Sequence, residues 1–319
     1  MNKKPVYILG IESSCDETSA SISCDGVILS NIIAGQEVHE RFGGVVPELA
    51  SRAHQQQIIP VVDAALSEAK VAKEELAAVA FTRGPGLIGS LLVGTSFAKS
   101  FAMSLNIPLI EVNHMQAHVI GNFAGREGQK VDAPGFPFLC LTVSGGHTQI
   151  VRVDDYLKME IIGQTIDDAA GEAFDKVAKM LNLPYPGGPE VDKMAAQGNP
   201  KAFKFPVSDM PGLNYSFSGF KTSVLYFLQK QKQIQADFVE AKMADICASA
   251  QYTIITILLK KLTQAVAETG IKNIAIAGGV SANKGLRHAL LEKQNSEGWK
   301  VHIPSFEYCT DNAGMIALY

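Results

Sequence analysis

The sequence predicts an α/β protein of two related lobes that face each other across a cleft, and three observations carry this prediction. A strand–turn–strand pattern occupies residues 5–24 and is repeated at residues 138–153. In each half, apolar strands alternate with helical segments beyond this pattern. A stretch rich in glycine, proline and charge, 125–137, separates the halves as a linker would. The repeat indicates two domains built on one plan.

The composition is typical of a soluble globular protein. The chain has 319 residues, of which 47% are hydrophobic and 19% charged, as expected for two domains. The apolar run after Lys3 and Lys4 is too short for a signal peptide, and the longest uncharged stretch, 84–98, is too short and glycine-rich to span a membrane. Five single cysteines without a C-x-x-C pair indicate reduced thiols in a cytoplasmic protein.

The net charge of −4 argues against a protein that binds nucleic acid unaided, because phosphate contacts require local positive charge. A nucleic-acid substrate would need a local basic patch or a partner protein.

The first lobe begins as a β-meander. Strands are predicted at 5–11, 19–24 and 27–34, and the first two flank a polar turn, 12–18. The hydroxyls and carboxylates of this turn suit a phosphate with its hydrated cation. An ordinary surface hairpin explains the turn equally simply, and the turn alone favours that interpretation.

A helix is predicted at 48–70, a strand at 77–82 and a second helix at 90–105. The glycine turn between the last two, 83–89, imitates a dinucleotide-binding fingerprint. That fingerprint belongs to the first strand of its domain, whereas two strands precede this one. The glycines are therefore better explained by a tight turn and close helix packing.

Two histidines follow the apolar strand 107–112. If Asn113 caps a helix, the imidazoles of His114 and His118 project from one helical face, one turn apart. Such a pair is half of a metal site, or a pair of satisfied core histidines. A zinc protease would need a glutamate where the chain has Met115, so it would lack its general base.

The second lobe repeats the opening device, with strands at 138–143 and 149–153. Gly145 and Gly146 in the turn between them let the backbone approach a ligand, and consecutive amides there can bind anionic oxygens. His147, in the same turn, is either a general base or a structural residue.

Three acidic residues, Asp168, Glu172 and Asp175, share one face of a helix predicted at 165–183. Spacing alone favours a solvated face over a ligand site. Further on, 184–189 breaks the chain and 208–223 is too irregular to assign.

The remaining elements end at a second candidate anion site. A long amphipathic helix is predicted at 237–269 and a buried strand at 274–277. The glycine turn 278–283 then meets the N-terminus of a helix at 284–292, an arrangement that favours anions or nucleotides. The last helix starts at 309–312, with Asp311 at or near its cap.

Ten blocks of the sequence, in order and over nearly the whole chain, resemble one family. They are GIESSCDETS at 10–19, GGVVPELASRAH at 43–54, TRGPGLIGSLLVG at 82–94, NHMQAH at 113–118, VSGGHTQI at 143–150, DDAAGEAFDKVAKML at 167–181, YPGGP at 185–189, FSGFKT at 217–222, AGGVSAN at 277–283 and YCTDNAGM at 308–315. The family is the bacterial TsaD (YgjD) type of tRNA threonylcarbamoyladenosine transferase, once called an O-sialoglycoprotein endopeptidase. Members of this family usually continue beyond the point that corresponds to Tyr319, so we expect this sequence to end inside the last helix.

The resemblance implies the actin-like/Hsp70-like ATPase fold, the ASKHA fold, with two RNase H-like lobes around a central cleft. We expect residues 1–124 to form the N-terminal lobe, joined by the C-terminal helix 311–319, and residues 137–310 to form the C-terminal lobe.

The resemblance also implies the ligands. Asp311 joins His114 and His118 to hold one divalent metal per subunit, with Fe(II) as the expected ion and Zn(II) as the alternative. The nucleotide-like part of the substrate is expected along the second lobe, with Asp175 and Asp192 on ribose hydroxyls. The full set of substrate-binding residues implied is Thr142, Val143, Ser144, Gly145, Gly146, Asp175, Gly188, Asp192 and Asn283.

The activity implied is transfer of threonylcarbamoyl from threonylcarbamoyl-AMP to the exocyclic amine of the adenosine 3′ of the anticodon in tRNAs that read ANN codons. No side chain is an obvious covalent nucleophile, and direct attack requires none. The expected partners are tRNA, the paralogous TsaB and the small ATPase TsaE, without a membrane. The alternatives are an ATP-dependent kinase or chaperone-like ATPase of the same fold, a metalloprotease, and a non-catalytic scaffold in a tRNA-modifying assembly.

Overall fold

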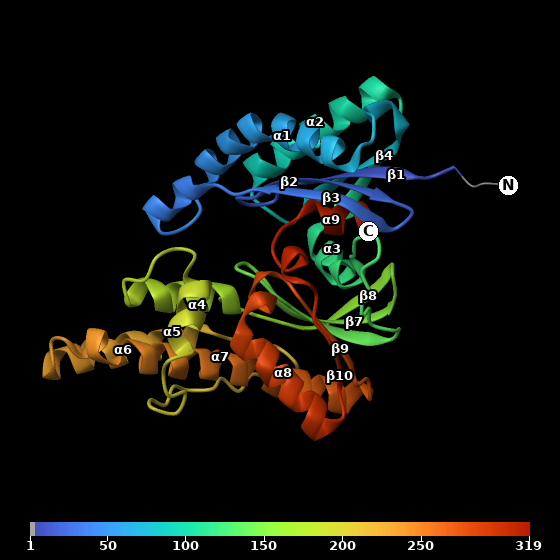
Figure 1. The fold of residues 1–319 in the computed structure, drawn as a ribbon. Coiled ribbons are helices and arrows are strands. Elements are labelled where there is room, and N and C mark those ends of the chain that lie inside the picture. Colours follow the sequence, from blue (N-terminus) through green and yellow to red (C-terminus); the bar gives the residue numbers. More distant parts are fainter. Residues whose placement is uncertain (1–3) are drawn as a thin grey trace. The chain divides into compact units, whose positions relative to one another are not determined.

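A computed structural model describes residues 4–319, apart from the side chains of residues 37 and 40. The chain divides into two compact units. Unit 1 comprises the described residues up to Ala133 together with Pro304–Tyr319, and unit 2 comprises Pro134–Ile303. Each unit contains one five-stranded mixed sheet, so the prediction of an α/β protein is confirmed (Figure 1).

The sheet of unit 1 has the order β3-β2-β1-β4-β5. In the central strand, Leu9 pairs with Ile22 on an antiparallel neighbour and with Val79 on a parallel neighbour. Its strands are β1 (Tyr7–Glu12), β2 (Thr18–Cys24), β3 (Val27–Ala34), β4 (Leu76–Gly84) and β5 (Leu109–Asn113). The predicted meander is thus the antiparallel half of this sheet, and the histidine-bearing segment follows its parallel edge.

Helices cover both faces of the first sheet (Figure 1). On one face α1 (Pro47–Ala69) and α2 (Ile88–Leu105) bury apolar residues of the sheet. On the other face lie α3 (His114–Ile120) and α9 (Ala313–Leu318). The contact with α9 requires a residue without a side chain, because a Cβ on Gly10 would lie 2.5 Å from the carbonyl oxygen of Ala313.

Helix α2 is the only helix among residues 4–319 whose length and apolar composition would suit a membrane span. A single helix of this kind is weak evidence for a membrane protein. Glycines just before and within α2 serve close packing, since a Cβ on Gly86 would lie 2.5 Å from the carbonyl oxygen of Ser14 and one on Gly94 would lie 2.1 Å from the Ser13 hydroxyl.

Unit 2 repeats the same strand order and the same directions, with the sheet β8-β7-β6-β9-β10. Its strands are β6 (Phe138–Val143), β7 (Thr148–Asp155), β8 (Lys158–Gln164), β9 (Asn273–Ala277) and β10 (Lys300–His302). The repeated strand–turn–strand pattern in the sequence corresponds to β1–β2 and β6–β7, so the predicted duplication is confirmed.

Five helices belong to unit 2. They are α4 (Ala170–Met180), α5 (Gly187–Ala195), α6 (Ser218–Ile234), α7 (Phe238–Thr269) and α8 (Lys284–Glu297). Helix α7 is its central helix, because residues spaced by one turn along it, including Ile246, Ile254 and Leu262, are completely buried. Short 3-10 helices at Glu37–Phe42, Lys73–Glu75, Gly121–Phe123, Gly279–Ala282 and Phe306–Tyr308 complete the described elements.

Several predicted boundaries were wrong. The helix expected at 165–183 spans only Ala170–Met180, so Asp168 precedes it and pairs instead with the amines of Lys176 and Lys221, each at 2.9 Å. The segment 208–223 contains the start of α6, where the Asp167 carboxylate accepts a hydrogen bond from the backbone N–H of Phe217 at 2.8 Å. This capping partner lies fifty residues away in sequence, which local patterns cannot reveal.

Candidate metal centre

The predicted histidine pair sits at the start of a short helix that begins as soon as β5 ends. The Asn113 side chain accepts hydrogen bonds from the backbone N–H groups of Met115 and Gln116, at 3.0 and 3.2 Å. This cap starts α3 at His114 and places His118 one turn further on the same face. Both imidazoles are buried, with ring centroids 4.6 Å apart. The predicted cap and the shared face are confirmed.

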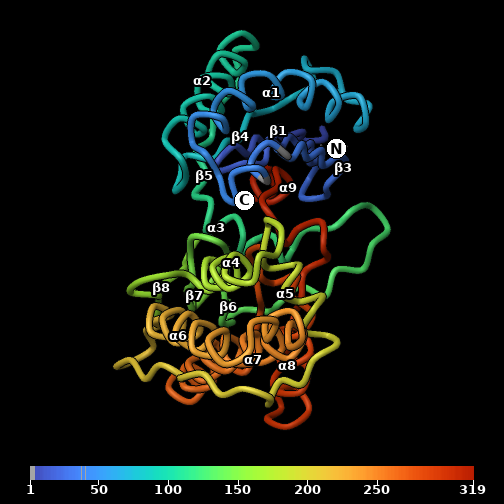
Figure 2. Tube along the Cα trace, turned by 90° about the vertical axis from the view of Figure 1, so that its left-hand side faces the viewer, coloured from blue at the N-terminus to red at the C-terminus, as the bar shows by residue number. Residues whose placement is uncertain are grey.

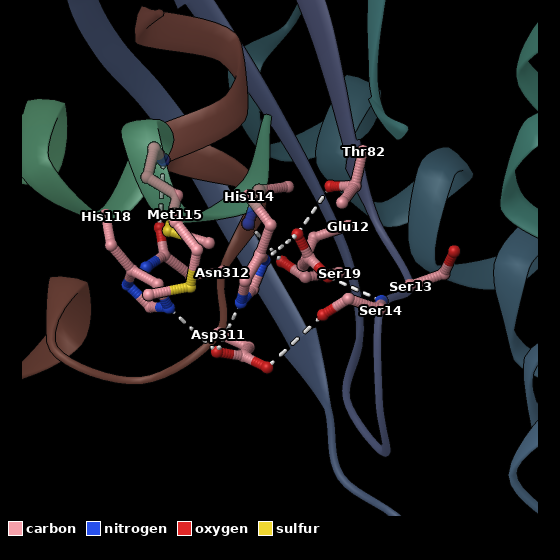
Figure 3. A network of polar contacts seen from close by, with 12 residues as sticks. Glu12, Ser13, Ser14, Ser19, Thr82, His114, Met115, His118, Asp311 and Asn312 are labelled. Carbon is pink, nitrogen blue, oxygen red and sulfur yellow. Dashed lines mark hydrogen bonds and ion pairs between the residues drawn. The ribbon is translucent and has the colours of Figure 1, made fainter. Parts of the chain in front are cut away.

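Asp311 reaches the histidines from the far end of the chain (Figure 3). Its Oδ1 atom lies 3.1 Å from the Nε2 atom of His118 and 3.5 Å from the Nε2 atom of His114. The cap of α9 is the neighbouring residue Asn312, whose side chain accepts the N–H of Met315 at 3.1 Å. Asp311 is therefore released from capping and can turn to the imidazoles.

The three side chains suit one divalent cation. Their ligand atoms all lie within 4.8 Å of one another. Nitrogen and oxygen donors bound to one ion at about 2.1 Å lie about 3.0–3.5 Å apart when the angle at the ion is about 90–110°. The two distances to Asp311 fall in that range. Two imidazoles and one carboxylate are a donor set that iron and zinc accept.

Glu12 completes the surroundings of this group. It is fully buried at the end of β1, where one carboxylate oxygen accepts the backbone N–H of Ser14 and the other accepts the hydroxyl of Thr82, each at 2.5 Å. The Glu12 oxygen that accepts the Thr82 hydroxyl also lies 3.1 Å from the Nδ1 atom of His114. A hydrogen bond from Nδ1–H to a carboxylate leaves the Nε2 lone pair of His114 directed at Asp311, as a metal ligand requires.

Sequence reasoning missed this role of Glu12. The available signal was its place as the last residue of a buried strand, next to the strand that ends at Thr82. From the sequence, the turn suits a phosphate with a hydrated cation, but the favoured interpretation is an ordinary surface hairpin. His118 has no equivalent holder, since its Nδ1 atom is buried without a hydrogen-bond partner among the residues that the structure describes.

The charges of the group are strongly coupled. Burial opposes ionisation of Asp311, but the neighbouring His114 and His118 hold the pKa of its carboxyl well below the usual range. Burial likewise lowers the pKa of His114, yet the charges of Glu12 and Asp311 raise it well above its usual value. A cation and a proton therefore compete for the same Nε2 atom, and cation binding releases the proton.

The turn between β1 and β2 adds further acidic groups beside Asp311. Burial, the charge of Asp311 and the charge of Asp16 raise the pKa of Glu17 well above its usual value. The Ser14 hydroxyl donates to Asp311 Oδ2 at 3.4 Å. Carboxylates crowded in this way repel one another, and a bound cation relieves the repulsion.

The corresponding turn of unit 2, between β6 and β7, has a different chemistry. The N–H of Ser144 donates to the carbonyl of His147 at 2.8 Å, and the N–H of His147 donates to the Ser144 hydroxyl at 3.1 Å. These bonds close a tight turn that leaves Gly145 and Gly146 exposed, with open space where a Cβ would point. Thr142 is buried in β6. Its hydroxyl donates to the Sγ atom of Cys140 at 3.7 Å.

The other predicted substrate residues surround two helix N-termini. Asp175 accepts the N–H of Gly187 at 2.9 Å, at the start of α5 and next to Gly188. Asn283 caps α8 by accepting the N–H of Leu286 at 2.8 Å.

Asp192 and Asn283 are joined through Gln251 of α7. The Gln251 amide donates to Asp192 at 3.1 Å and accepts from the Asn283 amide at 2.7 Å. Asp192 also accepts the N–H groups of Lys284 and Gly285, at 3.3 and 3.4 Å. Sequence reasoning missed Gln251, because nothing in a long amphipathic helix distinguishes it.

Comparison with solved structures defines the class of protein. The chain superposes on component A of (R)-2-hydroxyglutaryl-CoA dehydratase from Acidaminococcus fermentans with a TM-score of 0.57 at 16% identity, covering 98% of this chain and 97% of the other. It superposes on full-length HypF with a TM-score of 0.60 at 16% identity, covering 99% of this chain and 46% of HypF. These likenesses, with two sheets of one strand order, place the protein in the actin-like ATPase fold.

Sequence comparison defines the family within that fold. The family model described as TsaD, tRNA N6-adenosine threonylcarbamoyltransferase, matches residues 27–318. A protein of that name from Christiangramia forsetii is 63% identical, covering 100% of this chain and 93% of its own. One from Cytophaga hutchinsonii is 60% identical, covering 98% and 90%. The chain belongs to the TsaD family of tRNA N6-adenosine threonylcarbamoyltransferases, which confirms the resemblance and favours the transferase over the ATPase alternative.

Proposed function

We propose that the protein transfers the threonylcarbamoyl group of threonylcarbamoyl-AMP to the exocyclic amine of the adenosine 3′-adjacent to the anticodon in tRNAs that read ANN codons. AMP is the second product. The observation that carries the proposal is the convergence of His114, His118 and Asp311 in a chain that is 63% identical to a transferase of this name.

The reaction needs no covalent intermediate on the protein. The adenosine N6 atom attacks the carbonyl carbon of the carbamoyl group, and a carbon–nitrogen bond forms. The bond from that carbon to the phosphate oxygen breaks, and AMP leaves with the electron pair. The proton lost from N6 passes to solvent or to the leaving phosphate. Binding, orientation and charge stabilisation are the tasks left to the protein.

In unit 1, His114, His118 and Asp311 would hold one divalent metal. Bound there, the metal supplies Lewis-acid stabilisation of charge on substrate oxygens. The donor set suits Fe(II), our first choice, and Zn(II). Glu12 keeps the His114 ring in the tautomer that presents Nε2.

In unit 2, the exposed amides of Gly145 and Gly146 would bind the phosphate, because adjacent backbone N–H groups suit anionic oxygens. We assign the ribose hydroxyls to Asp175 and Asp192. In addition, Asp192 accepts hydrogen bonds from the N–H groups at the start of α8. The remaining members of the nucleotide site are Thr142, Val143, Ser144, Gly188 and Asn283. His147 is the one candidate for a general base in this turn.

The proposal includes a cytoplasmic location and the partners TsaB and TsaE, in addition to tRNA and threonylcarbamoyl-AMP. A net charge of −4 agrees with partners that help to hold tRNA.

The test is transfer of labelled threonylcarbamoyl to an ANN-decoding tRNA transcript by the purified protein with its partners. Wild type is compared with His114→Ala and with His288→Ala, a control on an exposed histidine of α8. We expect label on the adenosine with wild type and with the control, and none with His114→Ala.

Equal label with His114→Ala would remove the metal from the chemistry and make the histidine pair structural. No label with any protein, despite active partners, would overturn the transferase proposal. Steady ATP hydrolysis without tRNA would then favour the ATPase alternative.

A further inference from the structure

Positive charge is concentrated in one segment of this acidic chain. Residues 193–234 contain six lysines and one aspartate, a net charge of +5, whereas the whole chain carries −4. The segment comprises the end of α5, the connection from α5 to α6, and α6 itself. Extending it to residue 245, past the acidic start of α7, still leaves +3. Such a segment is the local basic patch that an acidic protein needs in order to bind nucleic acid.

The connection between α5 and α6 runs alongside the helices of unit 2 (Figure 2), and aromatic rings hold it there. The ring of Phe203 lies 4.9 Å from that of Phe227 on α6 and 5.8 Å from that of Phe238 at the start of α7. The ring of Phe205 lies 5.5 Å from that of Phe227. Between the two inward rings, Lys204 is exposed. The connection is therefore held along α6 with its lysine facing solvent.

Four lysines on α6 and its preceding connection are available to a ligand. Lys201, Lys204, Lys230 and Lys232 are exposed, and none has an acidic partner within ion-pair distance among residues 4–319 with described side chains. The one aspartate in the segment, Asp209, is already paired with Lys260 at 2.6 Å. Charges left unpaired in this way attract a polyanion over the distance of the Debye length.

An exposed aromatic ring lies among these charges. Tyr226 of α6 is 65% exposed, and Lys230 follows it by one helical turn on the same face. The opposite face of α6 is buried through Phe220, Val224 and Leu228. A base that leaves its stack can lie on such a ring while the amines contact the adjoining phosphates.

We propose that this basic face, defined as Lys201, Lys204 and Lys230 with Tyr226, binds the backbone of the tRNA substrate; Lys232, two residues beyond Lys230, points to another side of α6 and is left out. The inference rests on the proposed function, and it adds a docking surface in unit 2, on α6 and its preceding connection. The lysines supply affinity through phosphate contacts, and Tyr226 stacks on one unpaired base. Recognition of the adenosine that reacts is left to the catalytic residues.

The test is the affinity of the complete enzyme, with its partners, for a fluorescent ANN-decoding tRNA at several salt concentrations. The triple variant Lys201→Gln/Lys204→Gln/Lys230→Gln should bind about ten- to fiftyfold more weakly at about 0.15 M salt. The slope of log affinity against log salt should become shallower by about 2. Tyr226→Ala should weaken binding about tenfold and leave the slope unchanged, because stacking releases few ions.

The matched control is Lys73→Gln/Lys158→Gln/Lys300→Gln, which removes the same charge from exposed lysines outside the basic face. Wild-type affinity and slope in the triple variant would overturn the proposal and leave a charge-complementary protein as the alternative occupant. Equal weakening in the control would overturn it as well, since only net charge would then matter.

Transfer activity, measured in parallel, separates the two proposals. Transfer by wild type without any dependence on the basic face overturns the docking surface alone. If tRNA binding depends on the basic face but no transfer occurs, the proposed reaction is overturned and the proposed docking surface is supported.

Discussion

The two units use one sheet plan and fill its first turn with opposite chemistry. Each turn is braced by a glycine, because a Cβ on Gly86 would lie 2.5 Å from the Ser14 carbonyl oxygen and one on Gly171 would lie 2.4 Å from that of Ser144. In unit 1 the turn holds Asp16 and Glu17 and adjoins Asp311. In unit 2 it holds Gly145 and Gly146 and has no acid.

This difference shows that the same sheet can carry turns that suit different ligands. The acidic turn concentrates negative charge, which a cation relieves, whereas the glycine turn exposes N–H groups, which suit a phosphate. The strands position both turns, and a few turn residues determine whether a cation or an anion is favoured there. Variants that change one turn should therefore leave the chemistry of the other intact.

The largest effect is expected from Asp311→Ala. It removes one of the three proposed ligands from unit 1, so metal content measured by elemental analysis should fall to background and transfer should drop by at least a hundredfold, roughly the upper limit for outer-shell losses. Thr310→Ala, an exposed neighbour, is the control. Full transfer by Asp311→Ala, with partner binding intact, would support the scaffold alternative.

Glu12→Gln should act through His114 without touching the metal. We expect affinity for the metal to fall about ten- to a hundredfold, as for other residues that orient a ligating histidine. Titration of chelator-treated protein with Fe(II) or Zn(II) measures this. Glu111→Gln removes an exposed carboxylate of β5, the strand that leads into His114, and should bind metal as wild type does. If both variants bind equally well, the bond from His114 to Glu12 has no part in metal binding.

Gly145→Ala tests the turn of unit 2. A Cβ there meets nothing within 4 Å, so Tm and metal content should not change. The methyl group would enter the space assigned to the phosphate, and KM for threonylcarbamoyl-AMP should rise about tenfold, or about 1.4 kcal/mol. Gly171→Ala should instead lower Tm, because its Cβ would collide with backbone. An unchanged KM in Gly145→Ala would separate this turn from substrate binding.

The smallest effect is expected from Asn283→Ala. It removes the cap of α8, which should cost about 1 kcal/mol of unfolding free energy. Denaturant unfolding of Asn283→Ala and of Asn283→Ser, which keeps a capping oxygen, measures the difference. Metal affinity in unit 1 should be the same in both, and a change there would contradict the independence of the two turns.

Local sequence patterns predicted most strands, the helix cap at Asn113 and the histidine face, because these are determined by residues close in sequence. Alternating and buried strands gave the duplicated sheet, and Asn113 before an apolar helix gave the histidine face. Residues fixed by long-range contacts were missed, as shown by Glu12 against His114, Gln251 between Asp192 and Asn283, and Asp167 at the start of α6. The short edge strand β10 and the exposed β8 were also missed, since neither has a strong apolar signal.

The third proposed ligand, Asp311, was accessible only through resemblance. His118 and Asp311 are separated by 193 residues, and no spacing rule connects them. The basic face was not recognised from sequence either, because the net charge of the whole chain conceals a positive segment.

The return of Pro304–Tyr319 to unit 1 has a consequence for biosynthesis. The ribosome makes His114 and His118 first, then the whole of unit 2, and only afterwards Asp311. A nascent chain that carries the two histidines alone offers an incomplete set of ligands, so capture of a stray ion during translation is weak. Unit 2 is continuous and can fold while unit 1 waits for its last helix. If the three side chains hold the proposed metal, its loading would be a late step, restricted to chains in which both units have been made.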